Sequence, residues 1–398
     1  MALESISFFK HVAPYYAPCS VYIITHLLYR YFNGNVAWVL FLSYAYNFPY
    51  YKWNAIKPKK ENNFDRPTEK LLKDDDRFMG PIYMHVAMDT LTWLWCLCVI
   101  SGVYPEALPA EWFEDKITGT TGGYFLFVFL FGYLSGVNGL AGHELIHKRN
   151  DFDKMLGMTT YTKMLYSHFF LEHGSGHHRN VATPDDAATA RKDENFYCFY
   201  VRSACLGIYK TWERETSTLK IKYNREQVPW YVQLTQNRIS WFTALHIVIL
   251  AAILNIFGWR AFIWQLIYSA IGIFFIELIN YTEHYGLIRK KDVRGIYEPI
   301  TEQHSWNAPS STMLFRIQRH SDHHMHAYRP YQILRKFDNA PFMPYKYMYT
   351  LLLALCPPLW YATMNPLLKN KSAEKEDGVR IFFFSVVVSL AYSTYSFI

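Results

Sequence analysis

Two histidines four residues apart occur in the segment His143-Glu144-Leu145-Ile146-His147. On an α-helix, positions i and i+4 lie on the same face, so both imidazoles can bind one metal ion. Taken alone, this motif fits a zinc protease as well as any other metalloenzyme. The rest of the chain has to decide which metal chemistry the motif serves.

Three more histidine groups follow the first one along the chain. They lie in the segments EHGSGHH from Glu172, NYTEHYGL from Asn280 and QRHSDHH from Gln318. The four groups together provide nine candidate ligands, which are His143, His147, His173, His177, His178, His284, His320, His323 and His324. A single tetrahedral zinc takes three or four protein ligands, whereas two metals with four or five ligands each use all nine.

The ligand type does not choose the metal, because imidazole suits zinc, copper, iron and nickel. Redox-active iron is favoured, since a nitrogen-rich pair of metals beside a membrane-depth cavity suits the activation of O2 against lipid-soluble substrates. We therefore predict two non-haem iron ions with O2 as co-substrate. Four carboxylates beside these histidines are predicted to be outer-shell groups that accept the second ring N–H, and they are Glu144, Glu172, Glu283 and Asp322.

The composition indicates a membrane protein. Of 398 residues, 51% are hydrophobic and 18% aromatic, and only 18% are charged, against roughly 25% charged in ordinary soluble domains. The net charge of +7 could indicate a protein that binds nucleic acid, but the basic residues lie in blocks beside apolar segments. Membrane topology explains that pattern better, so nucleic acid is not predicted as a partner.

Six apolar segments approach the length of about 20 residues that a spanning helix needs. They cover residues 15–32, 35–53, 82–103, 121–142, 238–258 and 261–281. Residues 33–35 join the first two segments and residues 257–260 join the last two, so the six segments pair into three hairpins. Three basic blocks, at residues 54–77, near 143–237 and 285–346, then share one face, cytosolic or equivalent, and the acidic connection 104–120 lies on the other. The predicted fold is an all-α, multi-pass integral membrane protein with six transmembrane helices in three hairpins and a His-rich di-iron cap on one face.

Two further apolar runs lie near the end of the sequence. Pro357 and Pro358 interrupt the run 347–364, so it fits a re-entrant or interfacial helix about as well as a span. The run 381–398 is uncharged and long enough for an extra C-terminal hydrophobic helix. We predict one transmembrane hydroxylase domain over residues 1–365, and a polar linker with that helix over residues 366–398.

The histidine motifs resemble those of the membrane-bound alkane 1-monooxygenases, within the wider fatty acid desaturase and hydroxylase superfamily. The matching segments are HELIHK from His143, EHGSGHH from Glu172, NYTEHYGL from Asn280 and IQRHSDHH from Ile317. The resemblance extends over roughly residues 80–365. It is specific, because simple desaturases lack the HYG motif. Ile317 replaces a leucine of the family pattern, and the tail after Lys371 has no ready counterpart in the family.

The resemblance implies a di-iron monooxygenase whose nine histidines hold both irons. Such an enzyme inserts one oxygen atom from O2 into the terminal C–H bond of a medium- to long-chain alkane or related fatty chain. It also implies a rubredoxin-type electron carrier and an NAD(P)H-dependent reductase. Both would be separate proteins, since the six cysteines of this chain include no C-x-x-C pair.

Two other functions fit the same residues. The first is a fatty acyl desaturase or hydroxylase of the same superfamily. The second is a subunit of a larger membrane complex that retains the alkane hydroxylase fold, in which the aromatic surface and the apolar tail contact other membrane protein subunits or lipid.

Overall fold

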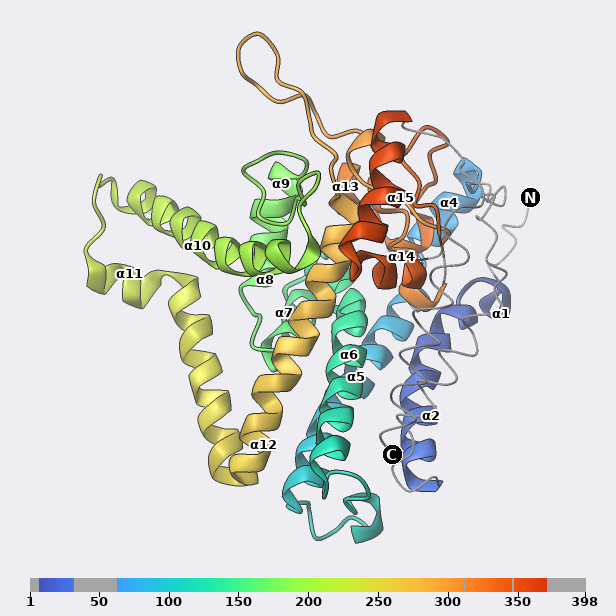
Figure 1. Ribbon diagram of the computed structural model, residues 1–398, viewed down its shortest axis with the longest axis vertical. Helices are drawn as coiled ribbons and strands as arrows, with labels where there is room; N and C mark the ends of the chain where they lie inside the picture. The colour runs from blue at the N-terminus through green and yellow to red at the C-terminus, as the bar shows by residue number, and fades with distance from the viewer. Residues whose placement is uncertain (1–6, 32–62, 311, 346, 371–398) are drawn as a thin grey trace.

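The regular structure is helical throughout the part of the chain that the structure describes. The computed structural model describes residues 7–31, 63–310, 312–345 and 347–370. Within these ranges there are only two isolated β-bridges and no strand. Long helices form a bundle at one end of the molecule, and shorter helices form a cap at the other (Figure 1). The predicted all-α class is therefore confirmed.

The bundle contains helices that are long and apolar enough to cross a membrane. They are α5 (Met79–Ser101), α6 (Thr121–Ile146) and α12 (Arg238–His284). Helix α12 is broken at Gly258, where φ is 79° and ψ is −178°, and its two arms lie at an angle in Figure 1. These arms correspond to the fifth and sixth predicted segments.

The six-helix arrangement as a whole stays a prediction. Helix α2 (Ala17–Tyr31), in the first predicted segment, has 15 residues. The second predicted segment, 35–53, lies outside the described residues.

The acidic connection lies at the end of the bundle opposite the cap. This connection joins α5 to α6 and includes the short helix η3 (Ala110–Trp112). The turn of α12 lies beside it, because the Arg260 guanidinium donates to the Thr118 carbonyl at 2.8 Å and Tyr124 donates its hydroxyl to the Arg260 carbonyl at 2.7 Å. The histidine motifs and this acidic connection thus occupy opposite ends, as the charge pattern predicts.

Small residues let α6 and α12 approach closely. A Cβ added at Gly136 would lie 2.6 Å from the Gly272 carbonyl oxygen and 2.8 Å from the Phe275 Cβ. One turn earlier, a Cβ at Gly132 would lie 2.9 Å from the Ile271 Cβ. Small residues spaced four apart are typical of helix contacts in membranes, because backbones can then pack directly.

We expect the Gly136→Ala variant to destabilise the bundle by about 1–3 kcal/mol, because the added methyl group has no room and forces the helices apart. Denaturant unfolding of the detergent-solubilised protein, followed by tryptophan fluorescence, measures this change. Gly122→Ala is the matched control, since an added Cβ there meets nothing within 4 Å. Equal stability of the two variants would contradict close packing at Gly136.

Helix α7 (Asp151–Lys163) runs back into the bundle beside α6 rather than staying in the cap. Tyr161 donates its hydroxyl to the Gly139 carbonyl at 3.0 Å, and Lys163 donates to the Ser135 hydroxyl at 2.6 Å. Ser135 precedes His143 by eight residues, about 12 Å along α6. The tip after Lys163 is buried in protein, which satisfies the condition for irregular backbone at membrane depth.

The cap consists of short helices contributed by distant parts of the chain. They are α4 (Arg66–Lys73), α8 (Phe169–Leu171), the π-helical turn η4 (Glu172–His177), α9 (His178–Asn180), α13 (His320–Met325), α14 (Tyr347–Ala354) and α15 (Pro357–Asn370). Helix α1 (Phe8–His11) and single 3₁₀ turns connect the larger elements, at η1 (Ala13–Tyr16), η2 (Asp76–Phe78), η5 (Glu302–His304), η6 (Thr312–Leu314) and η7 (Tyr331–Ile333).

The apolar run 347–364 forms two helices, with the break at Pro357 that the sequence predicts. Trp360 of α15 is fully buried and packs on Tyr281 and Tyr285, with ring centroids 5.3 and 5.2 Å away. Helix α15 continues to Asn370, and residues 371–398 lie outside the described residues. The predicted domain boundary and C-terminal helix therefore stay predictions.

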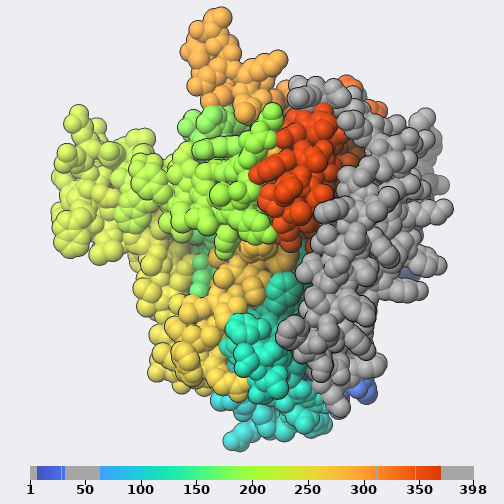
Figure 2. Space-filling view, viewed as in Figure 1, coloured from blue at the N-terminus to red at the C-terminus, as the bar shows by residue number. Residues whose placement is uncertain are grey.

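Two helices leave the body of the molecule sideways. Helix α10 (Phe196–Tyr223) and helix α11 (Trp230–Gln236) form this arm, which leads directly into α12. Figure 2 shows the arm as a projection at the side of the cap.

Candidate metal centre

The four histidine motifs come together where the bundle meets the cap. His143 lies in the last turn of α6, and His147 is the residue that ends this helix. His284 is the last residue of α12. The second motif forms the π-helical turn and the start of α9, and the fourth motif forms α13. The long apolar helices α6 and α12 thus supply three of the nine imidazoles at their ends, and the cap supplies six.

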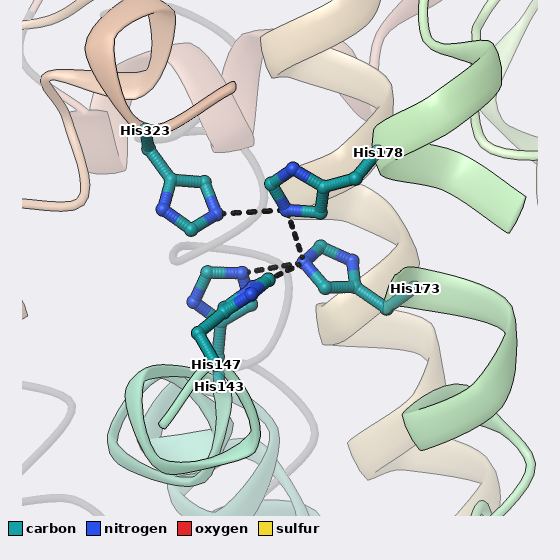
Figure 3. A group of neighbouring side chains, drawn as sticks. All are labelled: His143, His147, His173, His178 and His323. Carbon is teal, nitrogen blue, oxygen red and sulfur yellow. Dashed lines mark hydrogen bonds between the residues drawn. The ribbon is translucent and has the colours of Figure 1, made fainter. Parts of the chain in front are cut away.

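Five of the imidazoles form one group, which we call the five-histidine group: His143, His147, His173, His178 and His323. Figure 3 shows their rings converging. The Nε2 atom of His173 lies 2.7 Å from that of His143, 3.1 Å from that of His147 and 3.0 Å from that of His178. The Nε2 atoms of His178 and His323 lie 3.0 Å apart.

The other four imidazoles form the four-histidine group: His177, His284, His320 and His324. The Nε2 atom of His320 lies 3.0 Å from that of His284 and 2.9 Å from that of His324. The Nε2 atom of His177 is buried and has no hydrogen-bond partner among the described residues. The two groups adjoin, because the rings of His178 and His324 stack with centroids 4.5 Å apart.

The π-helical turn explains why one motif serves both groups. In an α-helix, His173 and His177 would share a face because they are four residues apart. In a π-helix the hydrogen bonds join residues five apart, so His173 is aligned with His178 instead. These two belong to the five-histidine group, whereas His177 belongs to the four-histidine group. Helix α13 divides differently, since His320 and His324 share a group and His323 joins the other.

Burial keeps most of these imidazoles in the neutral form that binds metals. It lowers the pKa of His147 to about 3, and it lowers the pKa of His173 and His178 well below the usual value. The same cause lowers the pKa of all three α13 histidines, which are His320, His323 and His324. Buried neutral imidazoles with converging Nε2 atoms are suitable metal ligands.

His177 is the exception, because a carboxylate holds its second nitrogen. Burial alone would lower the pKa of His177, but the charge of Asp186 and its hydrogen bond raise that pKa. The Nδ1 atom of His177 lies 2.9 Å from Asp186 Oδ2, which also accepts from the Thr189 hydroxyl at 2.6 Å. This contact fixes which nitrogen of His177 points into the four-histidine group.

Sequence analysis missed Asp186. Its only signal in the sequence was its place eight residues after His178, the last residue of the second motif.

The four carboxylates predicted from the sequence are all buried near the two groups, but none of the described contacts joins one of them to the second ring nitrogen, Nδ1, of a candidate ligand. Glu144 accepts from Lys148 at 2.6 Å, and Asp322 accepts from His326 Nδ1 at 2.9 Å and from the Arg335 N–H at 2.7 Å. Burial raises the pKa of Glu172 to about 7.

Glu283 lies closest to a candidate ligand. Its Oε2 atom lies 3.2 Å from His320 Nε2, on the nitrogen that faces the group, and its Oε1 atom accepts from the Tyr347 hydroxyl at 2.7 Å.

We expect the Asp186→Asn variant to bind metal about 10- to 100-fold more weakly, because an amide cannot hold the His177 ring as a carboxylate does. Metal content after dialysis against graded chelator concentrations measures this loss. Asp185→Asn is the matched control, since Asp185 is exposed and lies 4.0 Å from Lys210. Equal metal retention in both variants would exclude an orienting role for Asp186.

The donor set fits a pair of metal ions. Two nitrogens bound to one metal at about 2.1 Å and at a right angle lie about 3 Å apart. The Nε2 distances of 2.7 to 3.1 Å within both groups are close to that spacing. A set made only of imidazoles suits zinc, copper, iron and nickel, so the geometry supports metal binding without choosing the ion.

Comparison with known proteins gives the same families as the sequence motifs. The profile of the fatty acid desaturase family matches residues 120–353. Alkane 1-monooxygenase 1 of Pseudomonas aeruginosa is 36% identical over 249 residues, 62% of this chain and 64% of that protein.

Two other relatives carry a similar name. Alkane 1-monooxygenase of Pseudomonas putida is 32% identical over 331 residues, 80% of this chain and 77% of that protein. The protein of that name from Ectopseudomonas oleovorans is 39% identical over 236 residues, 58% of this chain and 57% of that protein. The match to the Pseudomonas aeruginosa relative covers 64% of that protein, which is less than two thirds of its length.

Proposed function

This chain belongs to the fatty acid desaturase family and, within it, to the alkane 1-monooxygenases, and on that premise we propose that it is a membrane-bound di-iron monooxygenase. It inserts one atom of O2 into the terminal C–H bond of a medium- to long-chain alkane or related fatty chain. Two electrons and two protons reduce the other oxygen atom to water. The observation that carries this proposal is the convergence of nine imidazoles in two adjoining groups at the ends of apolar helices.

Each histidine group would hold one iron, and the converging Nε2 atoms would be its ligands. Bound iron supplies the redox chemistry that O2 needs. The protein holds the ligand rings in one orientation, through helices α6 and α12 on the bundle side and through Asp186 behind His177. Glu144, Glu172, Glu283 and Asp322 form the buried acidic surroundings of the site.

The apolar side chains of the bundle surround the hydrocarbon chain of the substrate and exclude water from the site. Substrate enters from the lipid, and the histidine cap lies on the cytosolic or equivalent side of a six-helix, multi-pass fold. A separate rubredoxin-type carrier, reduced by its NAD(P)H-dependent reductase, delivers electrons to the basic face. The hydroxylase domain comprises residues 1–365, and residues 366–398 form the linker and an additional apolar helix.

Metal content and product identity test the proposal together. We expect about two irons per chain, and we expect purified protein supplied with reductant and O2 to convert octane to 1-octanol with label from ¹⁸O₂. Removal of the metal by a chelator should abolish the product, and added Fe²⁺ should restore it. A double bond in an acyl substrate, with no alcohol from octane, would instead identify a desaturase. Absence of bound iron would refute both enzymes and favour the accessory-subunit alternative.

A further inference from the structure

The arm formed by α10 and α11 exposes an apolar stripe. Along α10 the exposed side chains Tyr197, Val201, Cys205 and Ile208 follow one another at spacings of four, four and three residues. This spacing places them on one face of the helix. Val201 is 60% exposed and Tyr197 50% exposed. Tyr197, at the inner end of the stripe, donates its hydroxyl to the Leu355 carbonyl at 2.9 Å, whereas Val201 and Ile208 further out are exposed.

Helix α11 turns its apolar side outward too. Trp230, Tyr231 and Leu234 are 74%, 56% and 58% exposed. Polar side chains instead make the contacts that fasten α11 to α10. Gln233 lies 3.3 Å from the Thr216 hydroxyl, and Gln236 accepts from Lys222 at 3.1 Å. A helical hairpin in water buries its apolar side chains between the helices, so this arrangement suits an apolar surrounding.

The arm lies at the level where spanning helices meet the cap. The Arg238 guanidinium, at the start of α12, donates to the Glu215 carboxylate of α10 at 2.7 Å. Trp241, in the first turn of α12, is 64% exposed. On the inner side, Tyr200 of α10 donates to the Ala270 carbonyl at 3.5 Å, 14 residues before the end of α12. Exposed Trp and Tyr side chains at such a level are typical of membrane interfaces.

Basic residues gather at the outer end of the arm. Lys220, Lys222 and Arg225 are exposed there, with Glu226 beside them. Basic side chains next to an apolar face complement the phosphates of lipid headgroups. The charge and the continuity with α12 therefore favour lipid as the occupant of this surface over a second copy of the chain.

We propose that the α10–α11 arm lies within the bilayer interface on the cap side, with Tyr197, Val201, Trp230, Tyr231 and Leu234 among the acyl chains. The arm then extends the membrane footprint of the protein beyond its spanning helices. This inference concerns the surface of the protein and does not depend on the metal chemistry.

Spin labels on the full-length protein test the proposal. Single labels are placed at Val201→Cys, Leu234→Cys and Ser217→Cys in a background with Cys198→Ser and Cys205→Ser. The unsubstituted background gives the contribution of the remaining cysteines. The protein is reconstituted into vesicles of phosphatidylcholine with about 30% phosphatidylglycerol. Power saturation then compares collisions with O2, which concentrates in lipid, and with a water-soluble nickel complex.

Labels at 201 and 234 are expected to collide several-fold more with O2 than with nickel. The label at 217, on the exposed polar side of α10, should show the reverse preference. Nickel contact at 201 and 234 equal to that at 217 would show that the arm lies in water and would overturn the proposal. Shielding of 201 and 234 from both reagents would also overturn it, in favour of a protein partner or a second copy.

Discussion

Replacing His177 with alanine is expected to lower hydroxylation of octane more than about 100-fold, since loss of a residue that only orients a metal ligand already costs about 10- to 100-fold. The variant removes a Nε2 atom from the four-histidine group and leaves Asp186 buried without its imidazole partner. His323→Ala removes a ligand from the five-histidine group and should have a comparable effect. Iron per chain and product formation are the two measurements.

The two variants also show which of the two histidine groups each ligand serves. Each should lose iron mainly from its own group, so the iron content falls from about two to about one per chain or lower. His26→Ala is the matched control, because His26 lies on α2 and contacts the Tyr22 carbonyl of its own helix. Unchanged iron and turnover in His177→Ala would refute the assignment of the four-histidine group as a metal site.

Removing one partner of the ion pair between Asp89 and Lys163 is expected to destabilise the protein by about 3–5 kcal/mol. Both side chains are at most 5% exposed, and Lys163 also donates to the Ser135 hydroxyl at 2.6 Å and to the Tyr268 hydroxyl at 3.2 Å. The pair links the tip of α7 to α5 inside the bundle. Lys163→Met leaves the carboxylate of Asp89 buried without its counter-ion.

The double variant Asp89→Leu with Lys163→Met distinguishes the effect of an unpaired buried charge on stability from the effect of altered packing. It removes both charges, so its stability should return to within about 1 kcal/mol of the starting protein or exceed it. Lys154→Met on the same helix is the control, since Lys154 pairs at 3.2 Å with a fully exposed Asp151. This substitution should change the free energy of unfolding by less than about 0.5 kcal/mol. Denaturant unfolding measures all four proteins. A double variant as unstable as Lys163→Met would contradict the charge argument.

Local spacing was enough to predict the parts of the site that lie within regular helices. His143 and His147 follow α-helical periodicity and do share a group, as do His320 and His324. The apolar segments and the acidic connection likewise follow from composition, because hydropathy and charge act over whole segments.

Features set by tertiary contacts were not predictable in this way. Lys163, at the end of α7, lies in a basic block of the sequence and was therefore predicted to lie in the cap. Only its contacts with Asp89 and Ser135 show that this end of α7 returns into the bundle. Asp186 meets His177 through a non-helical loop that has no periodic signal. The division of the ligands between two groups depends on a π-helical turn, which single-sequence propensities do not specify.

The π-helical turn at Glu172–His177 also sets how many groups the second motif can supply. A π turn holds one residue more than an α turn. Without that residue, the three imidazoles of the motif would be spaced i, i+3 and i+4, and these positions lie on one face of an α-helix. His177 would then lie on the same side as His173 and His178, instead of facing the other group. One residue of helix length thus decides whether this motif supplies one group of imidazoles or two.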